Sequence, residues 1–340
     1  MRMELPEHVK TIIQKLESHG YEAYAVGGCV RDTLLGRTPG DWDITTSAAP
    51  QQVKAIFRKT VDTGIQHGTV TVILDHVGYE VTTYRIDGDY ADSRHPSEVT
   101  FTSNLEEDLK RRDFTINAMA YNEKTGLKDC FGGYEDLQKG IIRCVGDPKE
   151  RFGEDALRML RAVRFSAQLG FSIEENTRQA VRLLAGNLRQ ISAERIQTEL
   201  VKLLLSAHPD TLRTAWELDI TAVILPEFDA MMDTEQHNPH HCFTVGEHTL
   251  KALTCVPADR YLRLGMLFHD FGKPLCLSTD AKGIDHFYGH PKESARLASE
   301  ILHRLKFDND TRKRIVKLVE VHDDRQIPLN HRGVRRAIHR

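Results

Sequence analysis

The first fifty residues contain a pair of glycines and a pair of aspartates whose spacing suits chemistry on phosphates. Gly27 and Gly28 follow a strand-like run that ends at Val26. Paired glycines let the backbone turn tightly and bring free amide groups close to a phosphate. Asp41 and Asp43 lie two residues apart in Asp-Trp-Asp-Ile-Thr-Thr, which predicts a strand with both carboxylates on one face. Such a pair can bridge two Mg²⁺ ions roughly 3.5–4 Å apart, an arrangement suited to phosphoryl transfer.

Length and composition limit the possible classes of protein and their partners. A chain of 340 residues with 40% hydrophobic and 28% charged residues is long enough for two or three domains with their own cores. The net charge of -3 gives no overall attraction to nucleic acid, so RNA binding would need a local basic face. Six cysteines without a Cys-x-x-Cys pair argue against a zinc ribbon and a disulfide framework. No run reaches the length of a membrane span, so we expect a cytoplasmic protein with no membrane partner.

The elements that must position these residues alternate between helices and strands. Residues 6–19 have the apolar spacing of an amphipathic helix, and a short helix is predicted from the glycines to Gly36. After a further helix that begins near Pro50, two β-branched runs at 69–74 and 79–85 predict a hairpin. This alternation predicts an α/β head. The polar residues 86–104 lack a helical period and predict a long loop.

These residues resemble the nucleotidyltransferase superfamily of the polymerase beta type, and more narrowly the bacterial class II CCA-adding tRNA nucleotidyltransferases and poly(A) polymerases. In that family Gly-Gly-x-Val-Arg-Asp followed by Asp-x-Asp forms the catalytic core, and each position is filled here, including Gly28 and Arg31. The resemblance implies that Asp41, Asp43 and Glu80 form a catalytic carboxylate set. From the residues alone, the favoured interpretation of Glu80 is a solvent-facing strand glutamate. In relatives the loop that follows helps to switch from adding C to adding A.

A second stretch matches the family motif Arg-Arg-Asp-Phe-Thr-x-Asn-Ala. The resemblance implies that Arg112, Asp113 and Asn117 bind the triphosphate and the sugar 2'-hydroxyl. An arginine offers a fork of donors to phosphate oxygens, and a carboxylate can accept from a ribose hydroxyl that deoxyribose lacks. Residues 129–137 resemble the hinge motif of the family, although most glycine pairs of this kind are simply turns.

Asp147 and Pro148 predict the start of a helix that runs to residue 165 and carries the family motif Glu-Asp-x-x-Arg. Its side chains could form ordinary surface ion pairs. Alternatively, an aspartate that accepts and an arginine that donates would fit the pairing edges of cytosine and adenine, and leave polar groups unpaired against uracil and guanine. The resemblance assigns that role to Glu154, Asp155 and Arg158. Arg161 and Arg164 complete the expected nucleotide-binding set, and several later arginines could line an RNA-facing surface.

The remainder predicts helices and a second site. His269 and Asp270 stand at the end of an apolar helix in Phe-His-Asp-Phe-Gly-Lys, and further histidines lie on either side. Imidazole and carboxylate ligands suit a divalent transition metal. The spacing resembles the HD phosphohydrolase domain, which is appended to some tRNA nucleotidyltransferases, and implies either an active or a degenerate site. The ligands expected from this resemblance are His248, His269, Asp270 and His290, with His322 as a further candidate.

We therefore expect three domains: a nucleotidyltransferase head at 1–146, a helical neck and RNA-binding body at 147–235, and an HD domain at 236–340. Residues 334–340 read as the middle of a helix, so we expect the chain to be truncated before a tail that grips tRNA in relatives. The expected function is addition of CCA to tRNA from CTP and ATP with two Mg²⁺ ions. Alternatives are an A-adding enzyme or poly(A) polymerase, although the latter tends to have a basic Gly-Arg-Arg-Phe stretch where this chain has residues 63–69. From another class, the chain could be an HD phosphohydrolase with a nucleotide-sensing head. The oligomeric state is not predicted.

Overall fold

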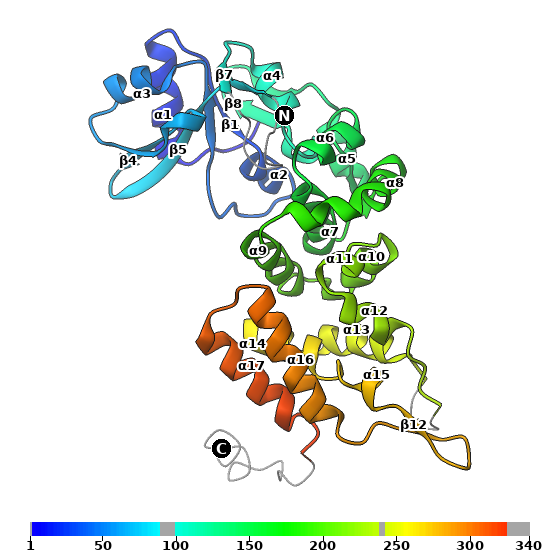
Figure 1. The fold of residues 1–340 in the computed structure, drawn as a ribbon. Coiled ribbons are helices and arrows are strands. Elements are labelled where there is room, and N and C mark those ends of the chain that lie inside the picture. Colours follow the sequence, from blue (N-terminus) through cyan, green and yellow to red (C-terminus); the bar gives the residue numbers. More distant parts are fainter. Residues whose placement is uncertain (1, 89–98, 238–241, 325–340) are drawn as a thin grey trace. The chain divides into compact units, whose positions relative to one another are not determined.

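The structure, a computed structural model, describes residues 2–88, 99–237 and 242–324 (Figure 1). The chain divides into two compact units. The first comprises Met1–Ala162 and Phe171–Gln190, and the second comprises Val163–Gly170 and Ile191–Arg340. A mixed sheet with helices makes up the first unit, and the second is largely helical. The predicted fold class, an α/β head followed by helices, is confirmed.

Seven strands form the main sheet of the first unit. They are β1 (Ala23–Val26), β2 (Ile44–Thr46), β3 (Thr60–Gly64), β4 (Thr69–Leu74), β5 (Val77–Thr83), β8 (Met119–Asn122) and β9 (Gly126–Asp129). Their order is β3-β4-β5-β2-β1-β8-β9. β2 and β5 are parallel, whereas the other neighbours run antiparallel. The candidate residues Asp41 and Asp43 therefore lie just before β2, a strand in the middle of the sheet.

Helices and two short strand pairs complete the first unit. The helices are α1 (Glu7–Ser18), α2 (Gly28–Leu34), α3 (Pro50–Ile56), α4 (Leu105–Lys110), α5 (Gly133–Lys139), α6 (Pro148–Glu154) and α8 (Glu175–Leu184), with 3₁₀ turns at Ile65–His67, Thr115–Asn117 and Ala185–Gln190. β6 (Arg85–Asp87) pairs with β7 (Val99–Phe101), and β10 (Ile141–Ile142) pairs with β11 (Ser172–Ile173). α1 buries Val9, Ile12, Ile13 and Leu16, as its spacing predicts. The boundary between the units falls within α7 (Leu157–Leu169).

The second unit is built from helices and one short hairpin. Its helices are α9 (Ala193–Leu204), α10 (Leu212–Glu217), α11 (Thr221–Ile224), α12 (Pro226–Met232), α13 (Val245–Cys255), α14 (Arg260–Phe268), α15 (Lys273–Cys276), α16 (His290–Arg304) and α17 (Asn309–Val321), with a 3₁₀ turn at Pro209–Thr211. β12 (Ser278–Thr279) and β13 (Asp285–His286) form the hairpin. α14, α16 and α17 pack against one another. Among the described residues, no helix combines the length and apolar character needed to cross a membrane.

Three local predictions were wrong. Asp41 and Asp43 do not lie within a strand, because β2 begins only at Ile44. The helix expected at 147–165 is broken at Asp155, whose backbone is extended (φ -141, ψ 102). Part of the loop expected at 86–104 pairs as β6 and β7, because the β-branched and aromatic residues of 99–101 can extend against 85–87.

Other predictions were close or fall outside the described residues. The turn of the β4–β5 hairpin has only two central residues, Asp75 and His76, both with positive φ. Such a two-residue turn matches the twist of the flanking strands. Residues 89–98, 238–241 and 334–340, on which the expectations about the switching loop, the polar loop and the end of the chain partly rest, lie outside the described residues.

Candidate functional site

Three carboxylates meet at the start of β2. Ile44 is in register with Val81 in the parallel pair β2–β5, so Asp43 continues alongside Glu80 and shares its face of the sheet. Partial burial raises the pKa of Glu80, and the charges of Asp43 and Asp41 raise it further. Burial also raises the pKa of Asp43. The charge of Arg112 lowers this pKa and the charge of Asp41 raises it, so that the pKa remains above its usual value. Acidic side chains that destabilise one another's charge, yet remain open to solvent, fit a site for hard divalent cations such as Mg²⁺.

The glycine turn lies directly beside these carboxylates. The amide of Val26 donates to the carbonyl of Asp43 (3.0 Å), and the amide of Gly27 donates to the carbonyl of Met119 (3.0 Å). Gly27 has φ +82, and a Cβ there would lie 2.9 Å from Nη1 of Arg112. The backbone conformation requires glycine, and the missing Cβ leaves room for the guanidinium group of Arg112. The turn therefore holds Arg112 and the start of α2, at Gly28, next to the acidic cluster.

Asp108 is a functional candidate that sequence reasoning missed. Its side chain is fully buried and accepts hydrogen bonds from Arg111 (2.8 Å) and from Oγ1 of Thr45 (3.0 Å), with Arg112 at 3.7 Å. Burial alone would raise the pKa of Asp108, but the two guanidinium groups outweigh it and lower the pKa. Asp108 thus ties the phosphate-binding candidate Arg112 to β2. The i, i+3 and i, i+4 spacing at the end of a charged helix was the available signal.

Four predicted nucleotide-binding residues form one hydrogen-bonded chain. Arg31 donates to Oδ1 of Asn117 (2.6 Å), and Asn117 donates through Nδ2 to Oδ1 of Asp113 (3.1 Å). Arg161 donates through Nε to Oδ2 of Asp113 (2.8 Å). The structure therefore brings together residues that are up to 130 positions apart in the sequence, counting from Arg31 to Arg161 (161 − 31). Each oxygen of Asp113 already has a partner, so any contact with a ribose hydroxyl must use a remaining lone pair.

The ionised carboxylate of Asp113 is expected to stabilise the fold at neutral pH and to lose this contribution in acid. Burial would raise the pKa of Asp113, but Arg161 and Asn117 lower it from 3.8 to about 2. Because the folded state holds this proton less tightly than the unfolded state, the contribution is present above about pH 4 and is lost as the pH falls towards 2. We expect about 2 kcal/mol of unfolding free energy to disappear over this range. Urea unfolding at several pH values measures this. The unfolding free energy of the unchanged chain should fall more steeply between pH 4 and 2 than that of Asp113→Asn, and an equal fall in both proteins would contradict the assignment.

The Glu-Asp-x-x-Arg residues are close together but are not on one helix. Glu154 ends α6, Asp155 lies in the break, and Arg158 is in the first turn of α7. Arg158 donates to Oε2 of Glu154 (2.7 Å), and the amide of Leu157 donates to Oδ1 of Asp155 (3.0 Å). Asp155 therefore caps α7, and its position depends on the break. Arg158 also helps to lower the pKa of Asp113, which places it at the same site.

Arg164 differs from the other predicted residues. It belongs to the second unit, where it is buried and donates to Glu199 and to Oε1 of Gln168 (2.7 Å). Its guanidinium also lies 3.7 Å from the centre of the Phe165 ring. These contacts account for its burial as a packing and ion-pair residue, so its role in nucleotide binding stays a prediction.

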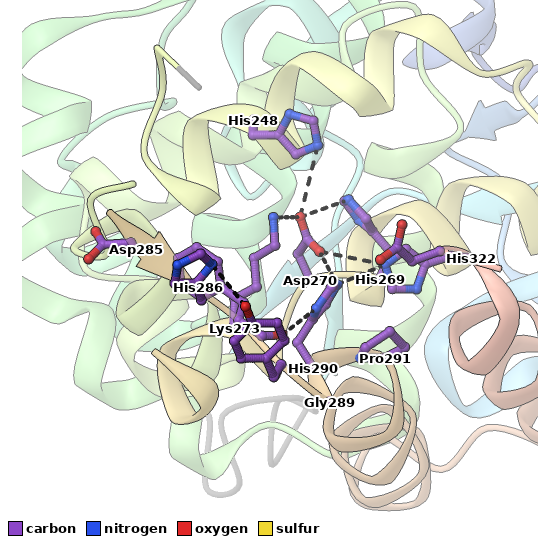
Figure 2. Close-up of a pocket in the computed structure, with 13 residues that line it drawn as sticks. His248, His269, Asp270, Lys273, Asp285, His286, Gly289, His290, Pro291 and His322 are labelled. Carbon is purple, nitrogen blue, oxygen red and sulfur yellow. Dashed lines mark hydrogen bonds and ion pairs between the residues drawn. The ribbon is translucent and has the colours of Figure 1, made fainter. Parts of the chain in front are cut away.

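The histidines predicted for the second site converge on Asp270 (Figure 2). His248 comes from α13, His269 and Asp270 follow α14, His290 begins α16 and His322 follows α17. Oδ2 of Asp270 lies 3.1 Å from Nε2 of His269 and 3.9 Å from Nε2 of His248. Oδ1 lies 3.3 Å from Nε2 of His290 and 3.6 Å from Nε2 of His322. Four segments of the second unit thus supply one cluster of possible metal ligands.

The orientation of the imidazole rings is informative. Nδ1 of His269, His290 and His322 lies 2.7, 2.8 and 2.6 Å from the backbone carbonyl three residues earlier. A carbonyl only accepts, so each Nδ1 carries the hydrogen, and a neutral ring then turns the lone pair of Nε2 towards Asp270. Nε2 of His290 and Nε2 of His322 also face each other at 3.2 Å. Lone pairs aimed at one another and at a carboxylate fit a cation held among them.

Lys273 is a second residue that sequence reasoning did not assign. Its buried ammonium donates to Oδ2 of Asp270 (2.9 Å) and to Oε1 of Gln236 (3.1 Å). The cluster and Lys273 line a pocket of about 420 Å³. The signal available in the sequence was a lysine three residues after Asp270.

The comparisons with known proteins agree with the sheet and its acidic site. Residues 23–143 match the poly A polymerase head domain, and residues 170–232 match the probable RNA and SrmB-binding site of polymerase A. The mixed sheet, its glycine turn and its three carboxylates define a nucleotidyltransferase head of this class. The structure of the Bacillus stearothermophilus CCA-adding enzyme in complex with CTP superposes with a TM-score of 0.72 at 35% identity, covering 98% of this chain and 75% of that one. The chain belongs to the family of CCA-adding enzymes.

Curated relatives support the same assignment over part of their length. The CCA-adding enzyme of Leuconostoc mesenteroides is 56% identical over 209 residues, 60% of this chain and 52% of that protein. The enzyme of Geobacillus thermodenitrificans is 58% identical over 193 residues, 57% of this chain and 48% of that protein. The match thus spans about half the length of these relatives. The Thermotoga maritima CCA-adding enzyme complexed with tRNA shares the fold, with a TM-score of 0.64 at 24% identity over 92% of this chain and 69% of that one.

Proposed function

We propose that the chain adds C, C and A to the 3' end of tRNA, using CTP and ATP. The observation that carries this proposal is the placement of Asp41, Asp43 and Glu80 beside the Gly27 turn and Arg112. The relatives are named CCA-adding enzymes, and one of their structures contains CTP. Two Mg²⁺ ions bound by the aspartates would stabilise the charge of the attacking and leaving oxygens.

The chain's own residues have distinct proposed roles in this reaction. Asp41 and Asp43 hold the metals, and Glu80 completes the acidic set. Arg112, fixed by Asp108 against the glycine turn, donates to the triphosphate. The network of Arg31, Asn117, Asp113 and Arg161 positions the ribose. The 3'-hydroxyl of the growing end attacks the α-phosphate and releases its proton, and one P–O bond forms as the bond to pyrophosphate breaks.

A tRNA that lacks its terminal CCA tests the proposal. It is offered with CTP alone, with ATP alone and with both, and products are resolved to single nucleotides. Ordered addition of C, C and then A supports the proposed activity. Addition of A alone, or only after two C residues are present, would make the chain an A-adding enzyme, and long A tails would make it a poly(A) polymerase.

We propose that Asp155 and Arg158 select C and A without a nucleic-acid template. Because Asp155 also caps α7, the informative variant is Asp155→Asn, which keeps a capping oxygen but adds a donor. We expect use of CTP relative to UTP to fall roughly 10- to 100-fold, the value of one hydrogen bond to a charged group. Competition assays with mixed nucleotides measure this ratio, and Glu150→Gln, on the exposed face of α6, is the control. An unchanged ratio in Asp155→Asn would remove Asp155 from base selection.

We also propose a second activity, metal-dependent phosphohydrolysis by an HD domain at 236–340. The Nε2 lone pairs that converge around Asp270 favour this activity, because imidazole nitrogens and a carboxylate are ligands that suit a divalent transition metal. The metal would supply Lewis acidity, while Lys273 adds a positive charge for a phosphate group. Hydrolysis of phosphomonoesters with Mn²⁺ or Ni²⁺, before and after a chelator, tests this activity. If the head alone were inactive and the hydrolase active, the chain would instead be a phosphohydrolase with a nucleotide-sensing head.

A further inference from the structure

The pocket of the histidine site, called the second pocket below, carries at its rim an aromatic pair that the proposed hydrolysis does not use. His286 and Tyr288 line the pocket together with Asp270 and Lys273. Their rings are stacked, with centroids 5.2 Å apart and planes 10° apart. Tyr288 is 78% exposed, the highest value among the exposed large hydrophobic side chains of the described residues. A side chain left so exposed at the mouth of a polar pocket is available to a ligand.

Hydrogen bonds within the β12–β13 hairpin and to Tyr288 hold this pair. Nε2 of His286 lies 3.1 Å from Oδ2 of Asp280, and Oδ1 of Asp280 accepts from the amides of Lys282 (2.8 Å) and Ile284 (3.0 Å). The hydroxyl of Tyr288 lies 3.3 Å from Nδ1 of His286. These contacts hold the pair in place before a ligand arrives. A preorganised aromatic face loses little entropy when a flat ring stacks on it.

The chemistry of the pocket differs between its two parts. Lys273 and the possible metal ligands can take an anionic phosphate, whereas Tyr288 offers the face of a phenol ring. A ligand that fits both parts carries a phosphate and an aromatic ring joined by a spacer. Nucleotides have this composition, because a sugar separates the base from the phosphate. Simple sugar phosphates would satisfy only the charged part.

We propose that Tyr288, stacked on His286, forms a nucleobase subsite and makes the second pocket selective for nucleoside phosphates over phosphates without a base. This proposal rests on the phosphohydrolase activity proposed above. Stacking of one base on an aromatic side chain contributes ~1–3 kcal/mol, which corresponds to about 5- to 150-fold in affinity. The preference is expected in KM, since the stacking residue does not touch the phosphate.

A matched pair of substrates tests the subsite. Adenosine 5'-monophosphate and ribose 5-phosphate differ by the base, and both are offered to the metal-loaded chain. In Tyr288→Ala, KM for the nucleotide should rise about 5- to 150-fold, while KM for ribose 5-phosphate changes less than about two-fold. Tyr288→Phe should retain the preference. Leu275→Ala, which removes another exposed apolar side chain outside this pocket, is the control.

A binding measurement separates failure of the subsite from failure of the hydrolase. Adenosine 5'-monophosphate is titrated calorimetrically into the metal-loaded chain and into Tyr288→Ala, whose head sites are identical. Weaker binding in the variant supports the subsite even if neither substrate is hydrolysed, in which case only the hydrolase proposal falls. Equal binding in both proteins, or an equal loss of activity towards both substrates, would overturn the subsite and leave Tyr288 as a brace of the hairpin.

Discussion

Asp43→Asn is expected to reduce nucleotide addition by about 10³-fold or more. The substitution keeps the size of the side chain but removes one negative charge from the cluster with Asp41 and Glu80. Metal-ion stabilisation of the transition state contributes several kcal/mol, and each 1.36 kcal/mol is a factor of about ten in rate. Single-turnover addition of the first C to a tRNA without CCA measures the effect.

The control is Asp62→Asn, which removes the same charge from an exposed ion pair with Lys54 in the same unit. It should leave the rate within about two-fold, because exposed pairs contribute little. Thermal unfolding of both variants separates a chemical loss from a folding defect. If folded Asp43→Asn keeps more than about a tenth of the activity, Asp43 is not a metal ligand of the reaction.

Asp270→Asn is expected to abolish metal binding and hydrolysis at the second site. Among the described residues, Asp270 is shared by both groups of possible ligands, and its two oxygens face different pairs of histidines. An amide of the same shape offers one oxygen and an unwanted donor, so both groups of ligands are disrupted. Calorimetric titration with Mn²⁺ or Ni²⁺ provides a readout that does not depend on the substrate.

Asp310→Asn, at an exposed position in the first turn of α17, controls for the change of charge. Nucleotide addition by Asp270→Asn should equal that of the unchanged chain, and hydrolysis by Asp43→Asn should also be intact. This reciprocal result would establish two independent sites. Undiminished metal affinity in Asp270→Asn would contradict the ligand assignment and leave the histidine cluster as a structural core.

Sequence patterns were reliable where the chemistry is local. The glycine pair, the amphipathic α1, the Pro50 helix start and the β4–β5 hairpin follow from neighbouring residues, and all are present. The motifs that identify the family are contiguous in the chain. The errors arose where neighbouring residues do not decide the conformation. Asp155 lies in a break between two helices because its carboxylate caps the second of them, and helix propensity alone cannot tell such a cap from a continuous helix.

By itself, the sequence determined the type of chemistry at each site: carboxylates near a glycine turn, arginines for phosphate, and imidazoles with one aspartate for a metal. Only the tertiary structure decided which of them meet. Asp108 joins the head site because it accepts a hydrogen bond from Thr45, whereas Arg164 donates to Glu199 in the second unit. Tyr288 and Lys273 became lining residues of one pocket with Asp270. The physical reason is that burial, charge compensation and ring orientation depend on segments far apart in the chain, and a single sequence records their chemistry but not their distances.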